Sequence, residues 1–289
     1  MAIEFLKQDV NATSSQPLLD DPAGDLLGRI GGLETRLART AREVDAAQAI
    51  RYRVFVEEMK AQLPQEAMRL RRDIDAYDAI CDHLLVLDRT IEGDIEDQIV
   101  GTYRLLRQEV AMAHGGFYSA SEFDIGPLLA RHPDKQFMEL GRSCVLPAYR
   151  TKRTVELLWQ GNWAYALKHG MSAMFGCASF PGIRPEEHAL ALSFLRHTVQ
   201  ARDEWAVAAL PDLYRDMDLM PFEGISPRKA LTAMPPLIKG YLRLGAMIGD
   251  GAVVDQAFNT TDVLVVLPIS SISDRYINYY GADAGRFAS

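Results

Sequence analysis

Apolar positions along the chain fall into two kinds of pattern, and their order predicts a sheet with helices packed on it. The apolar run 84–87 and the β-branched and aromatic-rich segment 98–106 are typical of strands, and the polar, glycine-containing segment 92–97 between them predicts a hairpin. Residues 43–59 instead place apolar side chains at helical spacing, which predicts a helix. The first part of the folded chain therefore combines both kinds of element.

The middle of the chain predicts a strand, a helix and a second strand in succession. Residues 137–145 and 173–178 have the composition of strands, whereas residues 154–169, and later 186–200, have helical spacing. Because strands joined by a helical crossover run parallel, we expect one parallel pair in a mixed sheet. The predicted fold class is therefore α/β, built as an α+β mixed sheet.

The C-terminal part is expected to complete the sheet around an inserted helical segment at 211–257. Residues 262–267 are mostly β-branched residues and leucines, which indicates a strand buried on both faces. Residues 205–210 predict a further strand. Within the insert, residues 235–248 predict a short helix, for which we expect core packing rather than contact with a membrane surface.

Length and composition indicate one large folded domain. With 289 residues, 48% of them hydrophobic, the chain can bury a substantial core. Residues 1–35 are rich in Asp, Ser, Gly and Pro and are expected to form a flexible extension, so that the domain covers 36–289. The formal net charge of −8 disfavours a nucleic-acid partner, which normally meets a basic face.

Cysteine usage and hydropathy indicate a cytoplasmic location. The three cysteines, Cys81, Cys144 and Cys177, match neither a disulfide framework nor metal-ligand spacing, which favours a reducing compartment. No apolar run approaches the roughly 18 residues that a transmembrane helix needs. We therefore expect a cytoplasmic protein, with at most peripheral contact at the inner membrane face.

Charged residues inside apolar runs mark the candidate site. Glu139 and Arg142 lie within the strand predicted at 137–145, where an unpaired charge would be costly. A local ion pair between them is, taken alone, about as plausible an interpretation as catalysis. Further charges on or beside core elements predict an ordered network lining one cleft, since isolated buried charges are unstable. These are Arg51, Asp75, Asp78 and Arg104.

A basic turn precedes the helix predicted at 154–169. Arg150, Lys152 and Arg153 stand next to the helix start at Thr154, where free backbone N–H groups favour an anion such as a phosphate. A solvated turn is the alternative interpretation. Arg69, Arg71 and Arg72 form a second basic cluster after a loop through Pro64.

Several other enzyme classes lack their motifs. His83 and Asp88 have the spacing of a histidine–aspartate acyltransferase motif, but the residues between them are core-forming, so we reject it. The sequence contains no nucleotide-type Gly-rich loop, no Gly-x-Ser-x-Gly elbow and no zinc spacing among its six histidines. Hydrolase, kinase and metalloenzyme functions are therefore not supported, and no metal is expected.

Four motifs together resemble the acyl-homoserine-lactone synthase branch of the GNAT acyltransferases. They stand in that family's order and spacing over roughly residues 45–180: Arg51-x-x-x-Phe55, Asp75-Ala76-Tyr77-Asp78, Val100-Gly101-Thr102-Tyr103-Arg104 and Glu139-Leu140-Gly141-Arg142. The tail segments 236–246 and 255–264 are instead similar to the ornithine N-acyltransferases that begin ornithine-lipid synthesis. That second resemblance covers nearly the whole chain after the extension.

The resemblance implies a GNAT-like fold and a reaction. A 3-hydroxyacyl group would pass from acyl carrier protein to the α-amine of L-ornithine, giving lyso-ornithine lipid, with acyl-phosphopantetheine as donor and no separate cofactor. Glu139 would accept the amine proton. The remaining members of the expected catalytic set would position it and hold the amino acid: Arg142, Arg104, Asp75, Asp78 and Arg51.

Backbone N–H groups around Ser143–Leu146 would face the thioester oxygen. Arg150, Lys152, Arg153 and Thr154 would seat the phosphopantetheine phosphate. Two alternatives remain. One is a lactone-synthase-type enzyme that uses S-adenosylmethionine, and the other is a non-catalytic module that binds an acyl carrier or a membrane surface.

Overall fold

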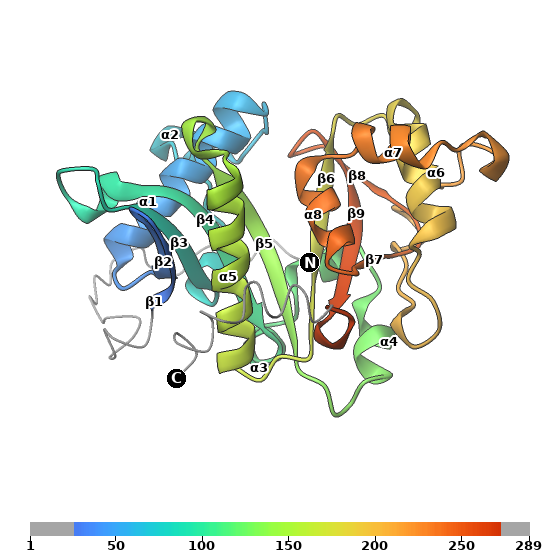
Figure 1. Cartoon of the computed structure of the whole chain (residues 1–289), viewed down its shortest axis with the longest axis horizontal. Coiled ribbons are helices and arrows are strands. Elements are labelled where there is room, and N and C mark those ends of the chain that lie inside the picture. The colour runs from blue at the N-terminus through green and yellow to red at the C-terminus, as the bar shows by residue number, and fades with distance from the viewer. Residues whose placement is uncertain (1–25, 273–289) are drawn as a thin grey trace.

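A mixed sheet forms the centre of the protein, as the computed structural model of residues 26–272 shows (Figure 1). The strands are β1 (Leu26–Ile30), β2 (Leu33–Leu37), β3 (Asp82–Asp88), β4 (Ile99–Arg107), β5 (Phe137–Val145), β6 (Ala173–Pro181), β7 (Met247–Ile248), β8 (Val253–Asp255) and β9 (Thr260–Pro268). Their order is β1-β2-β3-β4-β5-β6-β9-β7, with β8 also paired to β9. The predicted mixed α/β fold, with C-terminal strands completing the sheet, is confirmed.

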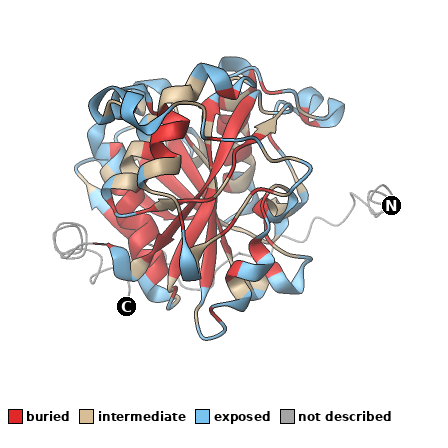
Figure 2. Ribbon diagram, turned by 90° about the vertical axis from the view of Figure 1, so that its right-hand side faces the viewer, coloured by how far each residue is buried: buried red, intermediate tan, exposed pale blue. Residues whose placement is uncertain are grey.

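Helices cover the sheet, and the strands themselves form the buried interior (Figure 2). The α-helices are α1 (Ala41–Tyr52), α2 (Gln65–Leu70), α3 (Gln108–Ala113), α4 (Ile125–Ala130), α5 (Lys152–Lys168), α6 (Ala189–Thr198), α7 (Pro227–Ala233) and α8 (Pro236–Arg243). The π-helix Arg53–Glu58 continues α1, so the helix predicted at 43–59 is found. No helix within residues 26–272 is long and apolar enough to cross a membrane.

The first hairpin corrects the expected N-terminal extension. Residues 26–35 do not belong to a flexible segment, because β1 and β2 pair antiparallel there; residues 1–25 lie outside the described part. The turn is Gly31-Gly32, and the positive φ of Gly31 (62°) allows the tight reversal. Leu27 and Leu37 are buried in the core, so the short strands are fixed by packing.

Both predicted pairings in the middle of the chain are confirmed. Strands β3 and β4 form the expected antiparallel hairpin, and β5 and β6, joined through α5, run parallel. The strand expected at 205–210 is wrong: that segment follows a short 3₁₀ turn, Asp203–Trp205, and makes only the isolated bridges Ala208↔Asp250 and Ala209↔Phe123. It packs at the edge of the sheet without joining it as a strand.

The expected helical insert 211–257 contains strands as well as helices. Besides α7 and α8 it carries β7 and β8, which pair with β9. Helix α8 packs on the core as expected, since Ile238 and Tyr241 are buried and the Tyr241 ring lies 5.0 Å from that of Trp159.

Strands β5 and β6 separate partway along their length, which opens the sheet beside the candidate site (Figure 1). Their pairing ends at Glu139↔Phe175; beyond it β5 pairs with β4, and β6 with β9. A Cβ atom on Gly176 would lie 2.1 Å from the Leu140 carbonyl oxygen, so only glycine fits this close approach.

Candidate active site

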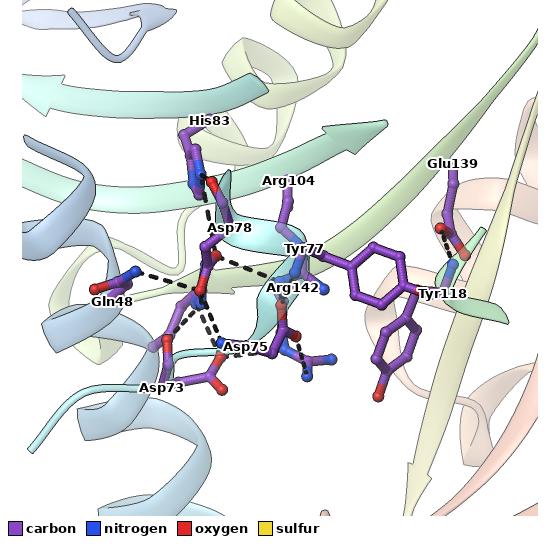
Figure 3. Close-up of polar contacts among 11 residues, drawn as sticks. Gln48, Asp73, Asp75, Tyr77, Asp78, His83, Arg104, Tyr118, Glu139 and Arg142 are labelled. Carbon is purple, nitrogen blue, oxygen red and sulfur yellow. Dashed lines mark hydrogen bonds and ion pairs between the residues drawn. The ribbon is translucent and has the colours of Figure 1, made fainter. Parts of the chain in front are cut away.

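Three arginines and three aspartates form a buried network between α1, the segment after α2, and strands β4 and β5 (Figure 3). Arg51 is completely buried; its Nε donates to Asp73 Oδ2 at 2.8 Å, and its Nη1 and Nη2 donate to Asp78 at 2.8 and 2.9 Å. Arg104 Nη1 donates to Asp75 at 2.6 Å and to Asp78 at 3.3 Å. The expected network is therefore present.

A short turn positions the acidic side of this network. Asp75 caps the 3₁₀ helix Ala76–Ala79, accepting from the Tyr77 N–H at 2.9 Å, and Asp78 accepts from the Asp75 N–H at 3.1 Å. This reciprocal capping box orients both carboxylates through bonds within the turn itself, independently of their contacts with arginines. The His83 Nε2 donates to the Asp78 carbonyl at 3.0 Å and thus buttresses the same turn.

Charge pairing offsets the burial of the network. Burial alone raises the pKa of Asp78, but the hydrogen bonds and charges of Arg51, with the charge of Arg104, outweigh burial and hold this pKa far below its ordinary value. Asp78 is therefore ionised at neutral pH. Removing one partner would leave an uncompensated buried charge, so the network is held together as a unit.

Arg142 enters the network from a bulge in β5. Its φ of 50° accompanies a shift in the pairing of β5 with β4 between Thr102 and Arg104. The guanidinium donates to Asp73 Oδ2 at 3.1 Å and to Asp75 Oδ2 at 3.2 Å. Its carbon also lies over two rings, 4.8 Å from that of Tyr118 and 4.4 Å from that of Phe258.

Glu139 stands apart from the arginines. Its Oε1 accepts from the backbone N–H of Ser119 at 2.7 Å and from the Ser119 hydroxyl, and its Oε2 accepts from the Tyr118 N–H at 2.8 Å. Figure 3 shows the Tyr77 and Tyr118 side chains between this carboxylate and the network. Burial raises the pKa of Glu139, and the bonds from Ser119 and Tyr118 offset part of that shift.

The local ion pair weighed for Glu139 and Arg142 does not form within residues 26–272, because each side chain has other partners. The expected row of free N–H groups at 143–146 is also partly wrong. Leu146 donates to the Val100 carbonyl at 2.9 Å, since the β4–β5 ladder continues past the bulge. The rejected pair His83 and Asp88 makes no relay either, as Asp88 accepts from Thr90 and Tyr149.

The basic residues of the turn before α5 differ in their contacts. Arg150 forms a bidentate pair with Glu58, at 2.5 and 2.6 Å, so its charge is already compensated. Lys152 and Arg153 are exposed, and Lys152 pairs with Glu156 at the surface at 3.3 Å. Thr154 is buried; its N–H donates to Thr151, which caps α5. The anion-binding role expected of Lys152 and Arg153 stays a prediction.

Several residues at the site have no counterpart in the sequence-based set. Asp73 bridges Arg51 and Arg142, and its spacing in Asp73-Ile74-Asp75 was a usable indication. Ser119 anchors Glu139. Three carboxylates that lie together next to Cys177 were also not predicted, because they come from three separate elements: Glu122, Asp255 and Asp262. These three are the described acidic residues close enough together to share a cation.

Comparison with known proteins makes this chain an acyltransferase of the GNAT fold. Residues 50–160 match the family model of the acetyltransferase (GNAT) domain. The chain is 78% identical over 268 residues to the L-ornithine N(alpha)-acyltransferase of Rhizobium meliloti, covering 93% of this chain and 90% of that protein. The enzyme of that name from Rhodobacter capsulatus is 39% identical over 247 residues, 86% of this chain and 94% of its own. The chain belongs to the L-ornithine N(alpha)-acyltransferase family.

Solved structures are more distant. An N-acyl amino acid synthase from uncultured soil microbes is 12% identical with a TM-score of 0.46, covering 82% of this chain and 91% of its own. An acyl-homoserine-lactone synthase, LasI, is 11% identical with a TM-score of 0.46, covering 86% and 95%. Likenesses at this level carry no information on substrate.

Proposed function

We propose that this acyltransferase moves a 3-hydroxyacyl group from acyl carrier protein to the α-amine of L-ornithine, forming lyso-ornithine lipid. The observation that carries this proposal is the 78% identity, along nine-tenths of both chains, to an enzyme named for ornithine N(alpha)-acylation. The same name recurs at 58% identity for the Brucella abortus protein, over 91% of this chain.

The chemistry requires few groups. The neutral α-amine nitrogen attacks the thioester carbonyl, the C–N bond forms as the C–S bond breaks, and the leaving carrier thiolate takes up the proton that the nitrogen loses by way of the proton acceptor. Glu139 accepts the amine proton, directly or through water, because its Oε2 has a single hydrogen-bond donor among the described residues and keeps a free lone pair. Burial, which raises its pKa, makes this carboxylate a stronger base than an exposed glutamate.

The network of arginines and aspartates supports this proton transfer indirectly, without contacting the reacting groups. Arg142, Arg104 and Arg51 form ion pairs that hold Asp75 and Asp78 in place. The guanidinium groups of Arg142 and Arg104 also lie over the ring of Tyr118. The backbone N–H of Tyr118 in turn donates to Glu139. We assign the network to positioning the Tyr118–Ser119 turn and through it the proton acceptor.

The donor arm is assigned to the start of α5. The backbone N–H groups of Lys152 and Arg153 open this 17-residue helix, and both side chains are exposed cations. We propose that they seat the phosphopantetheine phosphate and help dock the acidic carrier protein, with Thr151 and Thr154 shaping the turn. We place the reaction in the cytoplasm, with at most peripheral membrane contact.

Thiol release from 3-hydroxyacyl carrier protein tests the proposal. The purified protein is incubated with this donor and with L-ornithine or S-adenosylmethionine, and free carrier thiol and acylated product are measured. Thiol release and a mono-acylated product with ornithine alone are expected. Release with S-adenosylmethionine would favour a lactone synthase, and binding of the carrier without release would favour a non-catalytic module.

A further inference from the structure

Three carboxylates converge where β8 and β9 pack against the turn that carries Ser119. Glu122 follows that turn, Asp255 ends β8 and Asp262 lies near the start of β9. One carboxylate oxygen of each lies within 4.8 Å of those of the other two. Glu122 lies more than 130 residues before Asp255 and Asp262 in the sequence, so only the tertiary fold brings it to them.

One carboxylate oxygen of Asp262 is buried without a hydrogen-bond donor among the described residues. The residue is 5% exposed, and its Oδ1 atom has no hydrogen-bond partner among the described residues. Burial raises the pKa of Asp262 to about 6 and that of Glu122 to about 7, and the neighbouring carboxylates add to both shifts. Hydrogen bonds from Ser179 and Thr260 offset part of the rise in the Asp262 pKa, and one from Cys177 offsets part of the rise in the Glu122 pKa. Arg142 is a nearby cation, but its guanidinium donates to Asp73 and Asp75 instead. A buried carboxylate oxygen without a partner is costly, so Oδ1 is expected to meet a cation or donor when the site is filled.

The geometry points to a positively charged group of the acceptor: we propose that Glu122, Asp255 and Asp262 bind the side-chain ammonium of the acceptor amino acid. This rests on the proposed function and assigns the residues that select a diamino acid. The group adjoins the reaction centre, because Cys177 Sγ lies 3.3 Å from Glu122 Oε2 and 3.4 Å from Ser119 Oγ, and Ser119 bonds to Glu139. An α-amine at Glu139 thus places a three-carbon side chain toward the carboxylates.

An ammonium suits this group better than a metal ion. Three N–H donors at tetrahedral angles and contacts of about 2.8 Å place their acceptors roughly 4.6 Å apart, within the span of the three carboxylates. A Ca²⁺ or Mg²⁺ ion needs about six or more oxygens. Asp255 can offer its Oδ2 to one N–H donor, but its Oδ1 already accepts from the N–H groups of Ala257 and Phe258, which leaves the group short of six oxygens for a metal ion.

The test compares L-ornithine with L-norvaline, which has the same carbon chain without the terminal amine. Turnover of ornithine by the wild-type protein first checks the proposed function by itself. Asp262→Asn and Glu122→Gln are then expected to raise the KM for ornithine by roughly 10- to 100-fold, the scale of a lost hydrogen bond to a charged group. The kcat/KM for norvaline should stay within about twofold. Glu187→Gln, which removes an exposed charge in the 3₁₀ turn Pro185–His188 before α6, serves as the matched control.

Binding without chemistry gives a second measurement. Ornithine should raise the melting temperature of the wild-type protein more than norvaline does, and Glu122→Gln should remove this difference. Equal losses for both acceptors in both variants would overturn the proposal and assign the group a structural role. Loss of wild-type activity on chelation, restored by Mg²⁺ or Ca²⁺, would overturn it in favour of a metal site.

Discussion

Phe258 lies over Arg142, with 4.4 Å between the ring centroid and the guanidinium carbon. Phe258 sits in the β8–β9 turn, where Asp255 accepts from its backbone N–H at 3.0 Å, and its ring meets that of Phe55 edge-on at 5.8 Å. The C-terminal hairpin therefore closes over the charge network that the GNAT motifs supply. Contacts of this kind contribute roughly 0.5–2 kcal/mol when partly desolvated.

The C-terminal strand is expected to be essential for folding. All nine residues of β9 are buried, and the strand pairs with β6, β7 and β8. A chain that ends at residue 255 should therefore lack a cooperative thermal transition, which circular dichroism would show. A truncated protein that melts cooperatively near the full-length temperature would contradict this role.

Arg51 is expected to be the most sensitive residue of the network. Arg51→Met removes the closest cation from the buried Asp73 and Asp78 and leaves them only the longer contacts to Arg142 and Arg104, at 3.1 and 3.3 Å. The change should lower the free energy of unfolding by about 3–5 kcal/mol in urea titrations. Arg72→Met, which removes a half-exposed pair with Asp45, should cost less than about 1 kcal/mol. Adding Asp78→Asn to Arg51→Met should recover part of the loss; no recovery would argue against charge compensation.

Replacement of Glu139 tests whether its carboxylate takes part in catalysis or only supports the structure. Glu139→Gln is expected to lower kcat for acyl transfer by about 10²-fold or more, because the amide cannot accept the amine proton. It should also lower stability by about 1–3 kcal/mol, since one of the donors from Tyr118 or Ser119 would then face an N–H₂ group. Ser119→Ala, which keeps the carboxylate, should retain most of the turnover. Near-normal kcat in Glu139→Gln would make this residue structural.

The raised pKa of Glu122 predicts a pH-dependent difference in stability. Its pKa of about 7 in the folded protein exceeds the ordinary value near 4.5, so the folded state binds the proton more tightly. The resulting stabilisation is full below about pH 4.5 and is lost as pH rises through about 7. Each unit of difference between the folded and unfolded pKa values corresponds to about 1.4 kcal/mol in the free energy of unfolding.

Urea titrations of the wild type and Glu122→Gln across pH 4–8 provide the measurement. The wild-type free energy of unfolding should fall relative to that of the variant over this range. Groups with the opposite behaviour, such as Asp78, are present in both proteins and cancel in the difference. Parallel curves would show that Glu122 is not perturbed.

Carrier-protein docking should depend on the exposed cations at the start of α5. Reversing Lys152 and Arg153 to Glu is expected to raise the KM for acyl carrier protein and to flatten its salt dependence, with little change in the KM for ornithine. Arg150 should contribute less, because Glu58 already compensates it. Reversal of the exposed Arg228 and Lys229 on α7 provides a control of equal charge. Unchanged constants in the α5 variant would place the carrier elsewhere.

Local patterns in the sequence determined the main elements. The β3–β4 hairpin, the β5–α5–β6 crossover and the buried β9 follow from apolar periodicity, which reports burial directly. The sequence also singled out Arg51, Asp75, Asp78 and Arg104 as one network, because several charges within core elements must compensate one another. The catalytic roles given to these residues stay predictions.

Only the tertiary structure decided which charges meet. Arg142 contacts Asp73 and Asp75 rather than Glu139, because a bulge that no periodicity reveals redirects its side chain. The pairing of Arg150 with Glu58 likewise joins residues distant in sequence. The hydrophobic pattern fixes which residues are buried, whereas the partner of a buried charge depends on how separate elements pack, and the pattern holds no record of that packing.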